Sequence, residues 1–185
     1  MSMSAKTRKL ALIAVGIALF VVLSLCLQVP VFENYYLCLG YVVMAVYCWS
    51  FGTLSGTAVG FFGVILYCVV ISGLRGMPGW ALGNVVIGLL LGLCYKLTAG
   101  MKNQVLRQLL HAVVIVAASA LGILVVKSLT ECLLYSQPFV VRAGKNFSAF
   151  VADAAMLILS LPVCLALDKP ARKLFPELTV KREKP

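Results

Sequence analysis

Two ionisable side chains lie inside long apolar runs of this sequence and are its clearest candidates for chemistry. Lys127 comes eight residues before Tyr135, near the end of one run, and Asp153 comes seven residues after Asn146, near the start of the next. A charge at the centre of a bilayer costs at least about 2.5 kcal/mol, so such side chains pair internally or line a cavity. At about 1.5 Å per helical residue, both lie roughly 10–12 Å below the same membrane surface. They are expected to face each other or a shared ligand.

Polar and aromatic residues near that level predict an outward-facing pocket for a small molecule. The expected lining consists of Glu33, Asn34, Tyr36, Arg75, Trp80, Asn84, Lys127, Asn146 and Asp153. Aromatic side chains there offer a stacking surface for a flat ring. Two alternatives stay open. Lys127 and Asp153 could form a salt bridge that only joins two helices, and an interfacial aromatic belt would account for Tyr36 equally well.

Signals for catalysis or metal binding are weak. The stretch GTLSG at 52–56 differs from the GxSxG pattern of serine hydrolases, and His111 is the only histidine. The sequence has no Walker A motif, so any ATP must be hydrolysed by other subunits. The seven cysteines form no CxxC pair and are interpreted as small buried apolar residues. We therefore expect no enzyme activity, no catalytic residue, no metal site and no cofactor in this chain.

The composition requires membrane-spanning helices to position these residues. Apolar residues make up 62% of the 185 positions, charged residues make up 12%, and the mean hydropathy is +1.04. Soluble domains are about half apolar and a quarter charged, so a water-soluble fold is not expected. Six crossings of about 20 residues each use roughly 120 residues and leave only loops and tails. The predicted fold class is an all-α integral membrane protein, a compact bundle of six transmembrane helices.

Proline, glycine and polar residues divide the apolar runs into six predicted spans. These cover residues 8–27, 35–49, 54–71, 80–96, 106–134 and 146–167. The first span ends before Pro30, because the residue before a proline is pushed out of the helical conformation. Residues 72–79 and 136–145 are expected to be loops, and Pro162 is expected to bend the last span. Residues 1–167 would form one membrane domain and residues 168–185 a basic tail.

The basic residues predict the orientation of the bundle. Of the 16 lysines and arginines, 12 fall on one side of the predicted topology: Lys6, Arg8, Lys9, Lys96, Lys102, Arg107, Lys169, Arg172, Lys173, Lys181, Arg182 and Lys184. By the positive-inside rule, this side and both termini are cytoplasmic. The net charge of +10 is thereby explained by orientation and does not indicate nucleic-acid binding.

Small residues recur at the spacing that lets membrane helices pack closely. Examples are Ala14 and Ala18 in AVGIA, the glycines of FGTLSGTAVG at 51–60 and those of GWALGNVVIGL at 79–89. Together with the Val29-Pro30 end of the first span, the order and spacing of these motifs resemble the substrate-binding S components of energy-coupling-factor (ECF) vitamin transporters. The resemblance covers residues 6–167.

The resemblance implies a high-affinity substrate-binding subunit in the bacterial cytoplasmic membrane. Its partners would be a transmembrane scaffold, the T component, and two ABC ATPases. Ala14 and Ala18 would be the docking surface for the scaffold, and reorientation of the docked subunit would deliver the substrate. The alternatives are a free-standing small-molecule transporter, which would normally show an inverted repeat, and a structural or assembly subunit.

The substrate stays open at this point. Pantothenate, a pyrimidine or pyridine vitamin precursor, folate, riboflavin and a queuosine-like nucleoside all fit the mixture of aromatic and charged residues. The segment 31–41 does not match the longer charged segment of riboflavin-specific members, which disfavours riboflavin without excluding it. The nickel and cobalt members are not expected, because no cluster of histidine, cysteine and aspartate occurs near the N-terminus.

Overall fold

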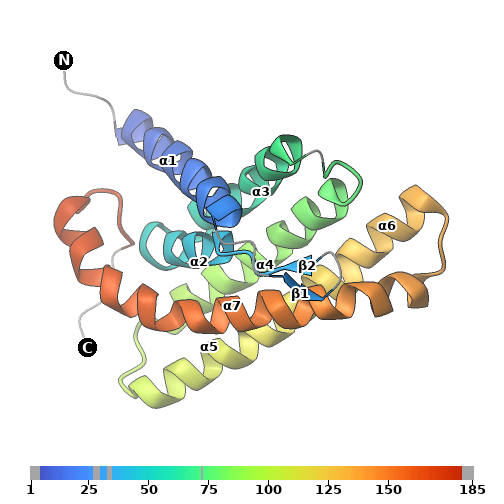
Figure 1. Cartoon of the computed structure of the whole chain (residues 1–185). Coiled ribbons are helices and arrows are strands. Elements are labelled where there is room, and N and C mark those ends of the chain that lie inside the picture. The colour runs from blue at the N-terminus through green and yellow to red at the C-terminus, as the bar shows by residue number, and fades with distance from the viewer. Residues whose placement is uncertain (1–4, 27–29, 33–34, 72, 181–185) are drawn as a thin grey trace.

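The computed structural model of the protein describes residues 5–26, 30–32, 35–71 and 73–180. Most of these residues are helical, as Figure 1 shows. The helices are α1 (Ala5–Cys26), α2 (Gly40–Phe51), α3 (Thr53–Val70), α4 (Met77–Leu97), α5 (Gln104–Ser119), η1 (Ala120–Lys127), α6 (Ser128–Tyr135) and α7 (Phe139–Leu174). Helices α5, η1 and α6 follow one another without a break and form one continuous segment. The described residues therefore contain six helical segments, the number that the apolar runs predict.

Five of the described segments are long and apolar enough to cross a membrane, namely α1, α3, α4, the continuous α5–η1–α6 and α7. The remaining segment, α2, is apolar but has only 12 residues. A full crossing needs about 20 helical residues. The prediction of a helical multi-pass membrane protein is confirmed, but α2 falls short of the predicted full-length span.

The prediction of a helix from residue 35 is wrong at its start. Pro30–Phe32 form strand β1 and Tyr35–Tyr36 form strand β2, an antiparallel pair in which Pro30 lies opposite Tyr36. Aromatic and β-branched residues favour extended backbone, and proline is tolerated at the first residue of a strand. Helix α2 therefore begins only at Gly40.

Glycines bring α4 against its neighbours. A Cβ atom at Gly83 would lie 2.6 Å from the carbonyl oxygen of Gly122 in η1, and one at Gly92 would lie 2.5 Å from the Cα atom of Thr53 in α3. Residues without a side chain are needed for such close backbone approach within a membrane. As a result α4 contacts α2, α3, α5, η1 and α6 and lies at the centre of the bundle.

The helix from Gln104 to Tyr135 is irregular in its middle third. The η1 segment is π-helical, and π-helical turns are uncommon and often occur near functional sites. The Ser128 hydroxyl donates a hydrogen bond of 3.2 Å to the carbonyl oxygen of Ile123, five residues earlier. Lys127 is the last residue of η1, so the π-helical turns set the direction of its side chain.

Helix α7 extends beyond the predicted span at both ends, from Phe139 to Leu174. The predicted loop at 136–145 shrinks to Ser136, Gln137 and Pro138, and Ser136 takes a left-handed conformation with φ 51°. Pro162 and Pro170 both lie inside the helix. Figure 1 shows its C-terminal part turning away from the line of the rest, as interior prolines cause.

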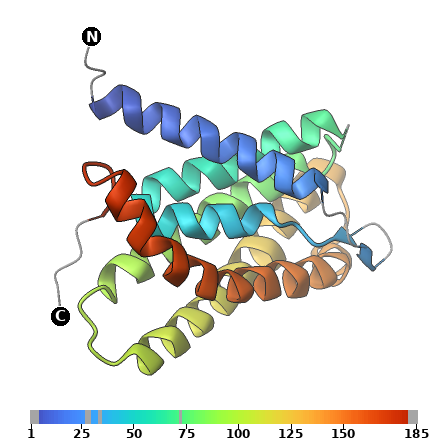
Figure 2. The same ribbon diagram turned by 60° about the vertical axis from the view of Figure 1, so that its left-hand side comes forward.

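The start of α1 and the segment that follows α7 lie at the same end of the bundle, as Figure 2 shows. Arg8 of α1 forms an exposed ion pair of 3.3 Å with Glu177, and the Val180 N–H donates a hydrogen bond of 2.9 Å to the Ser50 carbonyl oxygen. Six helical segments, an even number, are consistent with this arrangement. That this end faces the cytoplasm stays a prediction from the distribution of charge.

Candidate functional site

A cavity of about 230 Å³ lies near the start of α4, whereas Arg8, Glu177 and Val180 lie at the other end of the bundle. It is lined by Ser24, Leu37, Cys38, Tyr67, Cys68, Ile71, Gly73, Gly76, Trp80, Lys127, Ala149 and Asp153. We call it the Asp153 cavity. Three residues that the sequence singles out, Trp80, Lys127 and Asp153, come from α4, η1 and α7 and meet here.

Lys127 and Asp153 are both nearly buried, with 9% and 6% of their surface exposed. They interact electrostatically and line the same space. The matched depth expected from their positions in consecutive spans therefore corresponds to two ionisable side chains that line one cavity. Such an arrangement can hold a ligand that has both hydrogen-bond donors and acceptors.

A hydrogen-bonded tyrosine holds the wall of the Asp153 cavity in place. The Tyr41 hydroxyl of α2 lies 2.9 Å from Asp153 Oδ2 and 2.9 Å from Asn84 Oδ1, and it accepts a hydrogen bond of 2.8 Å from Trp80 Nε1. Tyr41 is fully buried. It thus orients two of the cavity residues, although it is absent from the lining itself.

The sequence does not predict that Tyr41 belongs to the site, because a tyrosine in an apolar run gives no sign of which partner its hydroxyl contacts. The useful signal is general: a buried tyrosine hydroxyl usually finds a hydrogen-bond partner, so one inside a predicted span marks a polar contact. Tyr67 escapes notice in the same way. Its ring stands at 87° to that of Trp80, with centroids 5.7 Å apart.

Asn84 lies behind the cavity wall and does not line the cavity. It is fully buried, and its Nδ2 donates a hydrogen bond of 3.1 Å to the Gly60 carbonyl oxygen of α3. With its Oδ1 close to the Tyr41 hydroxyl, it links α2, α3 and α4. Asn84 therefore supports Tyr41 through a hydrogen bond. It does not line the cavity, although the sequence predicts that it does.

Asn146 belongs to a neighbouring polar network. Its Nδ2 donates hydrogen bonds of 3.0 Å to Ser128 Oγ and 3.0 Å to Glu131 Oε2. Glu131 Oε2 also lies 3.8 Å from a terminal guanidinium nitrogen of Arg142. This network joins α6 to the first turns of α7, outside the lining of the Asp153 cavity.

Arg75 lines a second, adjacent cavity of about 300 Å³ together with Gly76, Glu131, Tyr135, Gln137 and Arg142. The guanidinium carbons of Arg75 and Arg142 lie 5.9 Å and 5.2 Å from the centroid of the Tyr135 ring, and the Tyr135 hydroxyl donates to the Arg75 carbonyl oxygen. Because Gly76 lines both cavities, Arg75 lies beside the Asp153 cavity but not in its wall.

The remaining predicted residues lie elsewhere. Glu33 and Asn34 are outside the described residues, and Tyr36 belongs to β2, whose backbone alone is described. Ala14 and Ala18 are exposed on α1, on the side away from Gly16 and Phe20, which pack into the bundle. A role for these two alanines in docking stays a prediction.

Comparison with known proteins agrees with the resemblance drawn from the motifs. A family model described as ECF-type riboflavin transporter, S component, matches residues 4–169. The chain is also similar to proteins named UPF0397 protein from Streptococcus thermophilus strains LMD-9 and CNRZ 1066, with 27% identity over 172 residues in each, covering 89% of this chain and 92% of the relative. No solved structure matches it. Since the family match extends from α1 into the C-terminal half of α7, the chain belongs to the ECF-type riboflavin transporter S component family.

Proposed function

We propose that this chain is the substrate-binding S component of an ECF importer, and that the Asp153 cavity holds a small metabolite with a flat ring and a hydrogen-bonding edge. Membership of the family supports the first part, because its members are substrate-specific membrane subunits. The observation that carries the second part is the meeting of Trp80, Lys127 and Asp153 around one cavity.

The chemistry of the lining defines the ligand class. The Asp153 carboxylate accepts hydrogen bonds from ring N–H or hydroxyl groups, and the Lys127 ammonium donates to carbonyl or carboxylate oxygens. Because Trp80 and Tyr67 stand nearly perpendicular, a flat ring can stack on one of them and meet the edge of the other. A polar heterocycle satisfies all four side chains at once.

Two ligand classes have specific support. Riboflavin is favoured by the description of the matched family. A smaller heterocycle, such as a pyrimidine or pyridine vitamin precursor, is favoured by the volume of about 230 Å³, since cavities for drug-sized ligands span roughly 300–1,000 Å³. Binding of riboflavin and of the smaller heterocycles is therefore tested in the same experiment.

The deciding experiment is mass spectrometry of small molecules released when the freshly purified, folded protein is denatured. We expect one ring-bearing molecule, retained at close to one per protein. Riboflavin is then titrated against the ligand-free protein and followed by quenching of its fluorescence, while the smaller rings are titrated by calorimetry. The variant Asp153→Asn should retain little ligand, and Lys145→Gln, at an exposed lysine in the same helix, should retain as much as the wild type. A folded protein that retains and binds none of these molecules contradicts the proposal.

Delivery of the substrate is proposed to require the T component and two ABC ATPases, with Ala14 and Ala18 as the docking surface. The exposure of both alanines on α1 supports this assignment, since small side chains allow a partner helix to approach closely. The isolated chain should not take up its ligand in liposomes. Uptake without the partners would instead indicate a free-standing transporter.

A further inference from the structure

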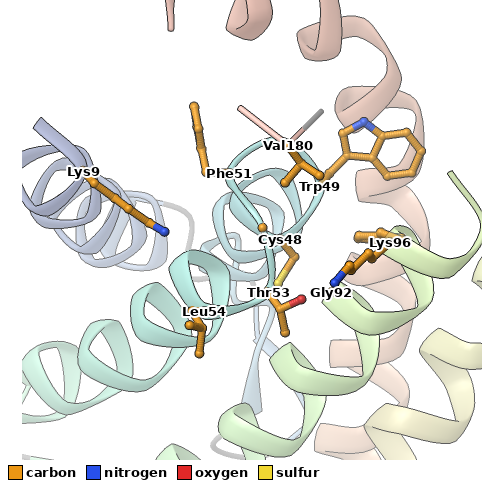
Figure 3. Close-up of a pocket in the computed structure, with 11 residues that line it drawn as sticks. Lys9, Cys48, Trp49, Phe51, Thr53, Leu54, Gly92, Lys96 and Val180 are labelled. Carbon is orange, nitrogen blue, oxygen red and sulfur yellow. The ribbon is translucent and has the colours of Figure 1, made fainter. Parts of the chain in front are cut away.

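A cavity of about 420 Å³ lies at the end of the bundle where α1 begins and α4 ends. Its lining consists of Lys9, Cys48, Trp49, Phe51, Gly52, Thr53, Leu54, Gly92, Tyr95, Lys96 and Val180. Figure 3 shows Lys9 reaching in from α1 and Lys96 from α4, with both ammonium nitrogens directed toward the start of α3, where Thr53 lies. We call this space the Lys9/Lys96 cavity.

The positive charge of the Lys9/Lys96 cavity is not balanced by the described residues around it. None of its lining residues is acidic. The described carboxylates at this end are already engaged, because Glu177 pairs with Arg8 at 3.3 Å and Asp168 pairs with Arg172 at 3.0 Å. Neither lysine forms an ion pair within the described residues. The cavity therefore suits an anion.

The start of α3 adds to this preference. The first N–H groups of a helix have no partner within the helix and carry part of the positive end of its dipole. Gly52, the N-cap residue of α3, has φ 92° and supplies no side-chain cap to these groups. The Thr53 hydroxyl at the cavity wall is a further hydrogen-bond donor.

Exposed leucines in the lining and next to the two lysines in the sequence indicate that the anion also has an apolar part. Leu54, in the lining itself, has 73% of its surface exposed. Leu10 and Leu97, which follow the two lysines in the sequence, are 69% and 74% exposed. In a membrane protein such leucines at the ends of spans face the acyl chains, so the cavity opens where the charged and apolar layers of the bilayer meet.

We propose that the Lys9/Lys96 cavity binds the phosphate group of an anionic phospholipid, with the acyl chains lying along Leu10, Leu54 and Leu97. Basic pockets between transmembrane helices on the cytoplasmic side bind such headgroups. The lipid site is separate from the Asp153 cavity, because α4 carries Trp80 at one cavity and Lys96 at the other, roughly 24 Å apart at 1.5 Å per residue. Inorganic phosphate shares the headgroup's chemistry, and the experiment distinguishes the two sources.

The first arm of the experiment counts bound lipids. Wild-type protein, K9Q/K96Q and the matched control K102Q/K173Q are each reconstituted in nanodiscs with equal phosphatidylglycerol and phosphatidylcholine, and retained lipids are identified by native mass spectrometry. The control removes two exposed lysines outside the cavity. We expect the wild type and the control to prefer phosphatidylglycerol. In K9Q/K96Q this preference should fall by about twenty-fivefold, at about fivefold per lysine. Equal preference in all three proteins overturns the proposal.

The second arm separates a lipid from free phosphate and guards against misfolding. Short-chain phosphatidylglycerol should raise the Tm of the delipidated wild type, whereas inorganic phosphate alone should not. A rise with phosphate together with no lipid preference assigns the site to free phosphate and overturns the lipid assignment. K9R/K96R should keep the preference and K9Q alone should lose about fivefold of it. Loss of the preference in K9R/K96R, with an unchanged circular dichroism spectrum, would argue against a role for the charge.

Discussion

The Tyr41 hydroxyl lies 2.9 Å from Asp153 Oδ2 and ties the short helix α2 to α7 at the Asp153 cavity. The same hydroxyl lies 2.9 Å from Asn84 Oδ1 and accepts a hydrogen bond from Trp80 Nε1. A phenol has a single proton, so Tyr41 can donate to only one of the two oxygens at a time. The Asp153 carboxylate has further lone pairs, so the proposed ligand would donate to a group that the Tyr41 hydroxyl already holds in position.

Replacing Tyr41 by phenylalanine should weaken both the fold and ligand binding. The ring stays, but Trp80 Nε1 and the oxygens of Asp153 and Asn84 lose a buried partner, which costs about 1–3 kcal/mol. We expect a lower Tm and at least a tenfold loss of ligand affinity, because Asp153 is no longer held in position. Thermal unfolding in detergent and calorimetric titration measure the two effects.

Tyr47→Phe is the matched control for Tyr41→Phe. Tyr47 also lies in α2, and its hydroxyl donates a hydrogen bond of 2.9 Å to the Leu12 carbonyl oxygen, away from the Asp153 cavity. This variant should lower the Tm without changing ligand affinity. If both variants lower the affinity equally, the effect belongs to α2 as a whole and the specific role of Tyr41 is wrong.

The two charged residues of the Asp153 cavity should each matter for binding. A hydrogen bond to a charged group is worth about 1.5–3 kcal/mol, so Lys127→Met and Asp153→Asn should each reduce ligand affinity by about tenfold to a hundredfold. Lys145→Met removes an exposed charge from α7 and should leave affinity unchanged. Wild-type affinity in folded Lys127→Met and Asp153→Asn would show that the two residues serve only to join the helices.

The packing of α4 on η1 predicts opposite effects for two glycine substitutions. In Gly83→Ala the new Cβ would lie 2.6 Å from the Gly122 carbonyl oxygen, so the backbone must shift and the Tm should fall. In Gly144→Ala the new Cβ meets nothing within 4 Å, and the better helix propensity of alanine should leave the Tm unchanged or raise it. A similar Tm for both variants would contradict the close approach of the two helices.

The long spans could be predicted from the sequence because a bilayer core imposes both their length and their apolar composition. The predicted span 54–71 corresponds to Thr53–Val70, and 80–96 lies within Met77–Leu97. The start of α7 could not be predicted in this way. Arg142 and Lys145 give the segment 136–145 the composition of a polar loop, but both residues lie in α7, in turns before the predicted span.

The meeting of Trp80, Lys127 and Asp153 could be predicted because depth along a helix follows directly from residue number. Depth does not give direction around the helix axis. The π-helical η1 rotates Lys127 relative to a regular helix, and α2 begins only at Gly40, directly before the Tyr41 that contacts Asp153. Neither feature has a signature in the hydropathy of the apolar runs, so the hydrogen bonds of the site appear only in the folded chain.

Introducing bulk on α1 should separate ligand binding from transport. In Ala14→Trp/Ala18→Trp two exposed small residues become large, which blocks the close approach of a partner helix without entering the bundle. Binding by the isolated protein should stay at the wild-type level, while uptake by cells that express the T component and both ATPases should be abolished.

The matched control for the α1 variant places the same bulk on another surface. Val105 and Leu109 of α5 are 79% and 62% exposed and have the same spacing of four residues, so Val105→Trp/Leu109→Trp places the same two tryptophan side chains on an exposed surface of α5. This variant should keep both binding and uptake. Loss of uptake in both variants would mean that any added bulk prevents assembly, and loss of binding in the α1 variant would place α1 in the substrate site. Only loss of uptake confined to Ala14→Trp/Ala18→Trp supports α1 as the docking surface, because both variants carry two exposed tryptophans and differ in the helix that carries them.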